Sequence, residues 1–212
     1  MPDSTYEGET PAKASEPDET LMARFRDGAE EGFQAVFNRY SAHVINFIYR
    51  FLKSQEESED LAQEVFLRIY RAKERYDPSR PFRPWLFSIA SRLVSNRLRD
   101  RKRHPHDSID QRTEMESGES LPRQIPDSPA DRPAELIEKK TIALAVQKAL
   151  DALPETQRMA VLLARFQGMS HEEIAVSLAT SVSAVKSLLF RSRQTLKEAL
   201  GPYVQSDSIP EK

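Results

Sequence analysis

Apolar residues recur at intervals of three and four along the first part of the chain, which predicts amphipathic helices. Between residues 21 and 51 this spacing marks one apolar face, and we expect breaks near Gly28 and Gly32. Ser54 is suited to cap a second helix that runs to about residue 75. Both helices therefore need a partner against which to bury an apolar face.

Prolines divide the middle of the chain. Pro78, Pro81 and Pro84 enforce a loop, because proline fixes φ and has no backbone donor. We expect Pro84 to be the first residue of a helix that reaches about residue 103. The following segment, residues 104–132, holds further prolines and excess acid without periodicity, which is typical of a linker.

The C-terminal part is again helical in pattern. Helices are expected over residues 136–153, and from Pro154 to Gly168. Ser170 and Glu173 have the spacing of a capping box, which predicts the start of a short helix ending near residue 178. A turn over residues 179–181 then leads into a longer helix over 182–200, which Gly201 and Pro202 should end.

The pattern as a whole predicts an all-α chain of two small helical domains joined by a flexible linker, since no segment shows the alternation of a strand. The expected boundaries, in order along the chain, are a disordered acidic lead over residues 1–18, a first domain over 19–104, a linker over 105–132, a second domain over 133–201 and a tail over 202–212.

Charge is distributed unevenly along the 212 residues, although the formal net charge is only −2. Residues 1–20 carry one base against six acids, and residues 104–140 carry five bases against nine acids. Residues 76–103, in contrast, carry eight bases against two acids. The average would argue against a nucleic-acid partner, but this local positive block favours one.

Composition excludes several classes of protein. There is no Cys, so disulfides, Cys-ligated metals and thiol nucleophiles are absent. The two closely spaced histidines, His104 and His106, are too few for a tetrahedral metal site. No apolar run is long enough to span a bilayer, and the acidic N-terminus does not resemble a signal peptide, so we expect a cytoplasmic protein without a cofactor.

The capped helix, three-residue turn and longer helix over residues 170–200 are the parts of a helix-turn-helix. Small Ala175 permits a close approach of the two helices, and Ala179 occupies a turn position where glycine would avoid strain. The residues that can then face a DNA major groove are Ser183, Lys186, Ser187, Phe190 and Arg191. An ordinary helical hairpin with a solvated basic face is the alternative.

Two earlier segments carry further candidate surfaces. Residues 82–103 interleave arginines with Phe82, Trp85 and Phe87, a combination suited to phosphates and unpaired bases, although these aromatic residues fit a core equally well. Residues 59–70 place carboxylates on the polar side of a helix. Nothing nearby completes a catalytic site, so this helix is either a protein-docking face or a solvated face.

These segments, in this order, resemble an extracytoplasmic-function sigma factor of the bacterial sigma-70 family. The resemblance covers about residues 21–104 and 136–200. The segment EDLAQEVFLRIYRA resembles region 2.2 of that family. The segment FRPWLFSIASRLVSNRLRDRKR resembles regions 2.3 and 2.4. The segment from LPETQ to LKEAL resembles region 4.

The resemblance implies roles and partners. The partners would be core RNA polymerase, through its β′ clamp helices and β flap, promoter DNA and an anti-sigma factor. Clamp contact would fall to Asp60, Leu61, Gln63, Glu64 and Phe66. Contact with the −10 element would fall to Arg80, Phe82, Arg83, Trp85, Arg92, Asn96, Arg97 and Arg99. Contact with the −35 element would fall to the five outward residues of the helix-turn-helix.

The same resemblance implies that the chain recruits the polymerase and does not catalyse a reaction. The acidic linker would run toward the RNA exit path and imitate nucleic acid there. Three rival interpretations are a stand-alone repressor or activator, a sigma mimic that only binds an anti-sigma factor, and an enzyme. The first leaves the segments at 59–70 and 82–103 unexplained, the second conflicts with the basic surfaces, and the third lacks a completed site.

Overall fold

The computed structural model describes residues 16–103 and 133–204, and the part it describes is helical without strands. Residues 1–15, 104–132 and 205–212 lie outside the described residues, and with them most of the predicted lead, the predicted linker and most of the tail. The all-α fold class is confirmed.

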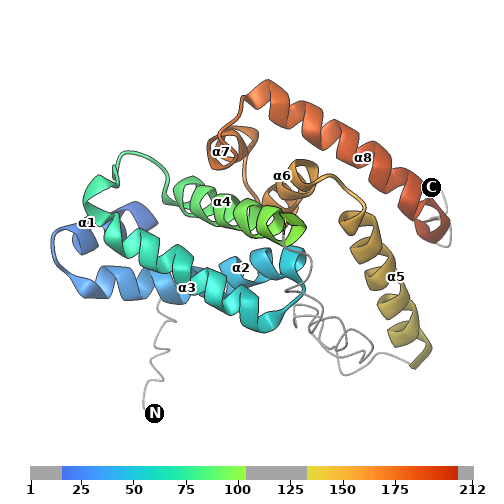
Figure 1. Ribbon diagram of the computed structural model, residues 1–212, viewed down its shortest axis with the longest axis horizontal. Helices are drawn as coiled ribbons and strands as arrows, with labels where there is room; N and C mark the ends of the chain where they lie inside the picture. The colour runs from blue at the N-terminus through green and yellow to red at the C-terminus, as the bar shows by residue number, and fades with distance from the viewer. Residues whose placement is uncertain (1–15, 104–132, 205–212) are drawn as a thin grey trace, which may run out of the picture.

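The first group of helices packs around the long second one (Figure 1). Its members are α1 (Asp18–Arg26), α2 (Glu30–Leu52), α3 (Gln55–Arg71), the short 3₁₀ helix η1 (Lys73–Arg75) and α4 (Phe82–Arg103). Helix α2 contacts α1, α3 and α4, so its apolar face is shared among three partners. The predicted helix to residue 75 is thus an α-helix that ends at Arg71, followed by one 3₁₀ turn.

The two glycines that were expected to break the first helix have different roles. Gly28 has a positive φ of 102° and lies in the turn between α1 and α2, as predicted. Gly32 lies inside α2, so the expected break there is wrong. A Cβ atom on Gly32 would lie 2.3 Å from the backbone oxygen of Leu21, and glycine is therefore what allows α1 and α2 to approach so closely.

Aromatic side chains fill the core of this first group. Phe66 stacks edge-on against Phe37 at a centroid distance of 4.8 Å, and Phe47 does the same with Phe87 at 5.4 Å. Aromatic pairs with centroids about 5 Å apart stabilise a fold beyond what the burial of their apolar surface contributes. The N-terminal domain therefore has a substantial core of its own.

The start of α4 is held by a residue from the other end of the domain. Glu19 of α1 accepts a hydrogen bond from the backbone N–H of Phe82 at 2.9 Å, which satisfies a donor at the helix N-terminus. Pro84 was expected to be the first helical residue, but α4 already begins at Phe82. Proline is tolerated at this third position because the first four N–H groups of a helix have no intrahelical partner.

The second group consists of α5 (Pro133–Asp151), α6 (Glu155–Phe166), α7 (His171–Ser177) and α8 (Val182–Val204). Ser170 and Glu173 form the predicted capping box at the start of α7, with both reciprocal hydrogen bonds present. Helix α8 does not end at Gly201 and Pro202 as expected but continues to Val204. Proline has a helix-compatible φ, so at an exposed helix end it mainly removes one backbone donor.

The turn between α7 and α8 has the geometry that the sequence predicted. Ala179 has a φ of 50°, in the left-handed region where glycine is the favoured residue. The two helices meet at an angle of 101°, within the range of helix-turn-helix motifs. Ile174, Ala175 and Val185 are buried at their crossing, as the pattern required.

Within the described residues, no single helix is long and apolar enough to cross a membrane. In the same part of the chain, α7 and α8 taken together meet the length and composition test, but they are bent by 101° relative to one another.

The two groups of helices lie against one another, which the sequence did not predict. Helix α7 packs on α4, and α6 lies near the end of α2 (Figure 1). The chain outside the described residues connects α4 to α5, so this contact joins segments far apart in sequence.

Candidate nucleic-acid interface

The N-terminal half of α8 presents a polar surface to solvent. All five residues predicted to enter a major groove are exposed, and Phe190 is 64% exposed. On the other side of the helix, Val185 is buried and Val182, Leu188 and Leu189 pack partly against the core. The structure therefore brings the five residues together on one face; they are Ser183, Lys186, Ser187, Phe190 and Arg191.

Serines organise the start of this helix. The Oγ of Ser181 accepts the backbone N–H of Ala184 at 3.2 Å and lies 3.0 Å from the Oγ of Ser183. The hydroxyl of Ser187 donates to the carbonyl of Ser183 at 3.0 Å. Since that donation uses the one proton of Ser187, its oxygen is left to act as an acceptor toward a DNA donor.

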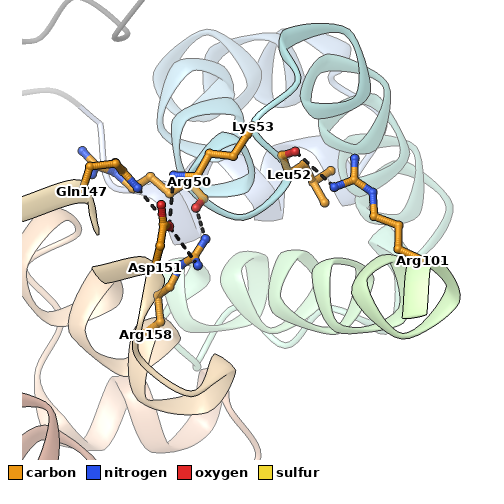
Figure 2. A network of polar contacts seen from close by, with 7 residues as sticks. All are labelled: Arg50, Leu52, Lys53, Arg101, Gln147, Asp151 and Arg158. Atoms are coloured by element: carbon orange, nitrogen blue, oxygen red, sulfur yellow. Dashed lines mark hydrogen bonds and ion pairs between the residues drawn. The ribbon is translucent and has the colours of Figure 1, made fainter. Parts of the chain in front are cut away.

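Helix α4 presents a strongly cationic surface. Arg92, Asn96, Arg97 and Arg99 are all exposed, and Arg99 donates to the Asn96 side chain at 3.3 Å. Arg101, in the same basic run, instead forms an ion pair with Glu57 at 2.7 Å and donates to the carbonyl of Leu52 (Figure 2). Arg83, at the start of the same helix, donates to the backbone carbonyl of Gln167. Arg92, Arg97 and Arg99 stay exposed, where phosphates could reach them.

The aromatic residues of α4 are mainly core. Phe82 and Phe87 are fully buried, and Trp85 is half-buried against Tyr76 at a centroid distance of 4.9 Å. Phe82 was expected to contact −10 DNA, but in this structure its ring lies among Tyr40, Tyr76 and Trp85 and has no surface to offer. Of the aromatic residues on this helix, Trp85 alone keeps a partly accessible ring.

The loop before α4 forms one wall of a cavity of about 740 Å³. Tyr76, Arg80 and Trp85 line it from the N-terminal domain, while Glu172 and Val176 of α7 line it from the C-terminal domain. Within the loop, Asp77 accepts the backbone N–H of Ser79 at 3.0 Å, and hydrogen bonds from the side chain and the backbone of Ser79 lower the pKa of the Asp77 carboxyl. Arg80 is highly exposed and only loosely paired with Asp77, at 3.5 Å.

Sequence reasoning missed a second cationic groove, of about 520 Å³, between α3 and α4. Trp85 and Ile89 form its apolar part, and the arginines that line it are Arg68, Arg71, Arg75 and Arg92. Only the last of these four was a predicted DNA contact. The spacing of Arg68 and Arg71 on α3, with Arg75 on the adjoining 3₁₀ turn, could have revealed the others, because helix residues three and four apart are neighbours.

Only some of the α3 residues predicted to contact polymerase are exposed. Asp60 and Gln63 are exposed, and Glu64 pairs with Arg68 at 2.7 Å. Leu61 and Phe66 were expected to contact a clamp helix, but they are 7% and 3% exposed, respectively, because they fill the core. The apolar residues that α3 does expose are Leu67 and Tyr70, at 48% and 40%.

The described residues offer no arrangement suited to a metal: among them no group of three or more His, Asp or Glu side chains converges. The surfaces above are made of arginines, exposed polar side chains and a few apolar side chains. Such surfaces can bind nucleic acid and protein.

Comparison with known families divides the chain in the same way. Residues 36–104 match the model for sigma-70 region 2, and residues 143–196 match the model for sigma-70 region 4. The first match includes α3 and all of α4, and the second includes α7 and most of α8.

Individual relatives extend over nearly the whole chain. The RNA polymerase sigma-H factor of Pseudomonas aeruginosa is 30% identical over 192 residues, covering 90% of this chain and 97% of the relative. The ECF RNA polymerase sigma-E factor of Escherichia coli K12 is 29% identical over 191 residues, with 89% and 96% covered. A structure of the sigma factor RpoE with the anti-sigma factor NepR from Bartonella quintana shares the fold, with a TM-score of 0.61, 22% identity, and 80% and 96% covered.

Proposed function

We propose how the surfaces of this chain divide the work of a sigma factor, since the chain belongs to the sigma-70 family and to its extracytoplasmic-function group. It is an alternative sigma factor, which binds core RNA polymerase and promoter DNA and directs transcription initiation.

We assign −35 contact to the exposed face of α8 and −10 contact to the exposed residues of α4 and its preceding loop. The supporting observation is that α8 exposes all five residues of one polar face at the N-terminal half of a helix-turn-helix. In such motifs this part of the second helix reaches base edges in the major groove. Lys186 and Arg191 would supply phosphate or guanine contacts, and the Ser187 oxygen would accept from a base donor.

The −10 assignment uses Arg80, Arg83, Trp85, Arg92, Asn96, Arg97 and Arg99. Phe82 is not included because it is buried; it belongs to the core and supports the ring of Trp85. Capturing a base out of the stack costs a few kcal/mol per step, which stacking on an aromatic ring and phosphate contacts can offset. Trp85 and the neighbouring arginines offer both kinds of interaction.

Clamp binding is assigned to the outer face of α3. Asp60, Gln63 and Glu64 would provide its polar contacts, and the exposed Leu67 would provide an apolar contact. Leu61 and Phe66 hold the helix in place from below. This set keeps the predicted polar residues of the helix and replaces the two buried apolar residues by exposed Leu67.

The chain would act in the cytoplasm, where the polymerase is, and without catalysis of its own. An anti-sigma factor is a further proposed partner, by analogy with the complex of RpoE and NepR. We also propose that the acidic segment at 104–132 imitates nucleic acid; neutralising its acids should change the yield of abortive transcripts.

Reconstitution with core RNA polymerase on a promoter library tests the proposal. The expected result is specific run-off transcription that requires this chain, with an affinity for DNA that falls steeply as salt rises, because phosphate contacts release counterions. DNA binding without core polymerase, combined with no transcripts, would instead support a stand-alone repressor.

A further inference from the structure

Two rows of side chains line the groove between α3 and α4. The row on α3 and the adjoining η1 consists of Arg68, Arg71, Ala72 and Arg75, and the row on α4 consists of Trp85, Ile89 and Arg92. Residues three and four apart lie on one face of a helix, which is why each row follows one side of the groove. All of these residues belong to the N-terminal domain, so the C-terminal domain is not needed to form the groove.

Most of the positive charge in this groove has no partner. Arg68 pairs with Glu64 at 2.7 Å. The guanidinium groups of Arg71, Arg75 and Arg92 are exposed and form no ion pair or hydrogen bond with any described residue. No acidic side chain is among the described residues that line the groove, whereas three carboxylates line the larger cavity beside the loop before α4. A ligand with several negative charges is therefore favoured in the groove and not in the larger cavity.

The apolar part of the groove contains Trp85, the only tryptophan of the chain. Tyr76 packs against the indole with the ring centroids 4.9 Å apart, which holds the indole in place, and Trp85 remains partly accessible. An aromatic ring offers a nucleobase a surface for stacking. Arginines offer phosphates several N–H donors in a planar fork. The groove thus combines the two groups that recognise a nucleotide.

We propose that this groove binds a free nucleoside triphosphate, with the base against Trp85 and the phosphates among the arginines. Its volume of about 520 Å³ lies within the range of small-molecule sites. Charge favours a free triphosphate over a nucleic-acid strand, because a strand brings one negative charge with each nucleotide, while a triphosphate concentrates several charges on adjacent phosphates. The described lining residues include no amide, hydroxyl or carboxylate side chain to read a base edge, so the number of phosphates matters more than the identity of the base.

A nucleotide in the groove competes with promoter DNA, because Trp85 and Arg92 belong both to the groove and to the proposed −10 surface. The affinity of the chain for the unpaired −10 strand then falls as the nucleotide concentration rises. This competition rests on the proposed assignment of −10 contacts, whereas the nucleotide site itself does not.

Tryptophan fluorescence of the full chain tests the site, since the signal comes from Trp85 alone. ATP should quench this fluorescence saturably at millimolar concentrations or below, and free tryptophan in a parallel titration corrects for light absorbed by the nucleotide. AMP should bind much more weakly than ATP, and inorganic triphosphate should displace ATP because it carries the charge without the base. Absence of saturable quenching, or equal affinities for ATP and AMP, would overturn the inference.

A pair of substitutions locates the phosphates. Arg71→Gln combined with Arg75→Gln removes two exposed charges of the groove and should weaken ATP binding about five- to tenfold, as expected for two exposed charge pairs. The matched control is Arg193→Gln combined with Lys197→Gln, two exposed cations of α8 outside the groove and outside the five −35 residues. The control protein should bind ATP like the parent protein. An equal loss in both proteins would mean that ATP is attracted by net charge alone, and the inference would be wrong.

Anisotropy with a labelled single −10 strand separates the two occupants. ATP should lower the apparent affinity for this strand in proportion to the occupancy that the quenching titration gives. If ATP does not quench Trp85 but the variant with both Arg71→Gln and Arg75→Gln binds the strand more weakly, the groove is a path for the strand and the inference is wrong. Saturable quenching by ATP without any loss of strand affinity would support the nucleotide site and count against the proposed −10 role of Trp85 and Arg92.

Discussion

Helices α4 and α8 are nearly the same length, 22 and 23 residues, and both are assigned to DNA, but they are embedded to different depths. Helix α4 buries eight of its residues, among them Phe82 and Phe87. In α8 only Val185 and Ser192 are buried. The first helix is therefore a core element with an arginine surface, whereas the second is a surface element with a narrow buried edge.

This difference in depth separates the two kinds of recognition. Melting DNA at −10 requires contact residues that are held rigidly in position, and the aromatic core that packs against α4 would hold them. Reading an intact major groove requires a helix that projects from the protein, and α8 projects. It follows that substitutions in the two domains should differ in how they divide between stability and binding.

The largest effect is expected from Phe66→Ala, compared with Leu67→Ala on the same helix. Phe66 is 3% exposed and Leu67 is 48% exposed. The first change leaves a cavity and should lower the free energy of unfolding by about 3–5 kcal/mol. The second should cost little stability and instead weaken binding to core polymerase. Denaturant unfolding and a polymerase-binding titration, run on both proteins, separate the two roles; a stable Phe66→Ala protein with weak polymerase binding would restore Phe66 as a contact.

The second comparison uses two helical glycines. In Gly32→Ala the new Cβ would meet the Leu21 carbonyl oxygen, and the overpacking should lower stability by about 1–3 kcal/mol. Gly201→Ala meets no atom within 4 Å and should raise stability by up to about 1 kcal/mol, since alanine favours a helix. Thermal unfolding monitored by circular dichroism checks both. If Gly32→Ala is as stable as the parent protein, α1 does not pack on α2 as described.

DNA binding gives the third comparison. Arg191→Ala and Lys186→Ala should each weaken −35 duplex binding by about 1–3 kcal/mol, or roughly five- to more than a hundredfold, and leave polymerase binding intact. Arg92→Ala should weaken single-strand binding instead and reduce its salt dependence by about one phosphate contact. Anisotropy titrations across a salt series distinguish these outcomes. Loss of polymerase binding in the α8 variants would mean that the two domains have been assigned wrongly.

The smallest effect concerns the turn of the helix-turn-helix. Ala179 is exposed and has a φ of 50°, so Ala179→Gly relieves backbone strain without removing a packed side chain. Relief of about 1–2 kcal/mol is partly offset by the greater freedom of glycine in the unfolded chain, which leaves a net gain of about 0.5 kcal/mol. A shift in the denaturation midpoint at constant slope is the measurement; a destabilised variant would show that the strain is not there.

Local structure was largely predictable, because it depends on neighbours in the sequence. The Ser54 cap, the capping box at Ser170 and the strained turn at Ala179 all follow from a few adjacent side chains, and all three are confirmed. Errors arose where a distant residue determines the outcome. Gly32 looked like a helix break because its reason for being glycine is the Leu21 carbonyl in another helix.

Burial was the other point on which sequence spacing was not enough. Helical periodicity groups Asp60, Gln63, Glu64 and Phe66 along one helix, but it does not say which of the apolar residues face inward. Phe66 is taken up by the aromatic cluster with Phe37, and Leu67 is left outside. In the same way Arg101 belongs to a basic run by sequence but to an ion pair with Glu57 by structure.

The sequence by itself determined the helices, their caps, the division into two domains and the concentration of positive charge on α4, since each depends on local pattern and composition. Only the tertiary structure decided which aromatic residues are core, which arginines from α3 and η1 join Arg92 in a groove, and that α7 packs on α4. These features depend on contacts between segments that are distant in sequence, and the spacing of residues along one helix does not specify which segment packs against it.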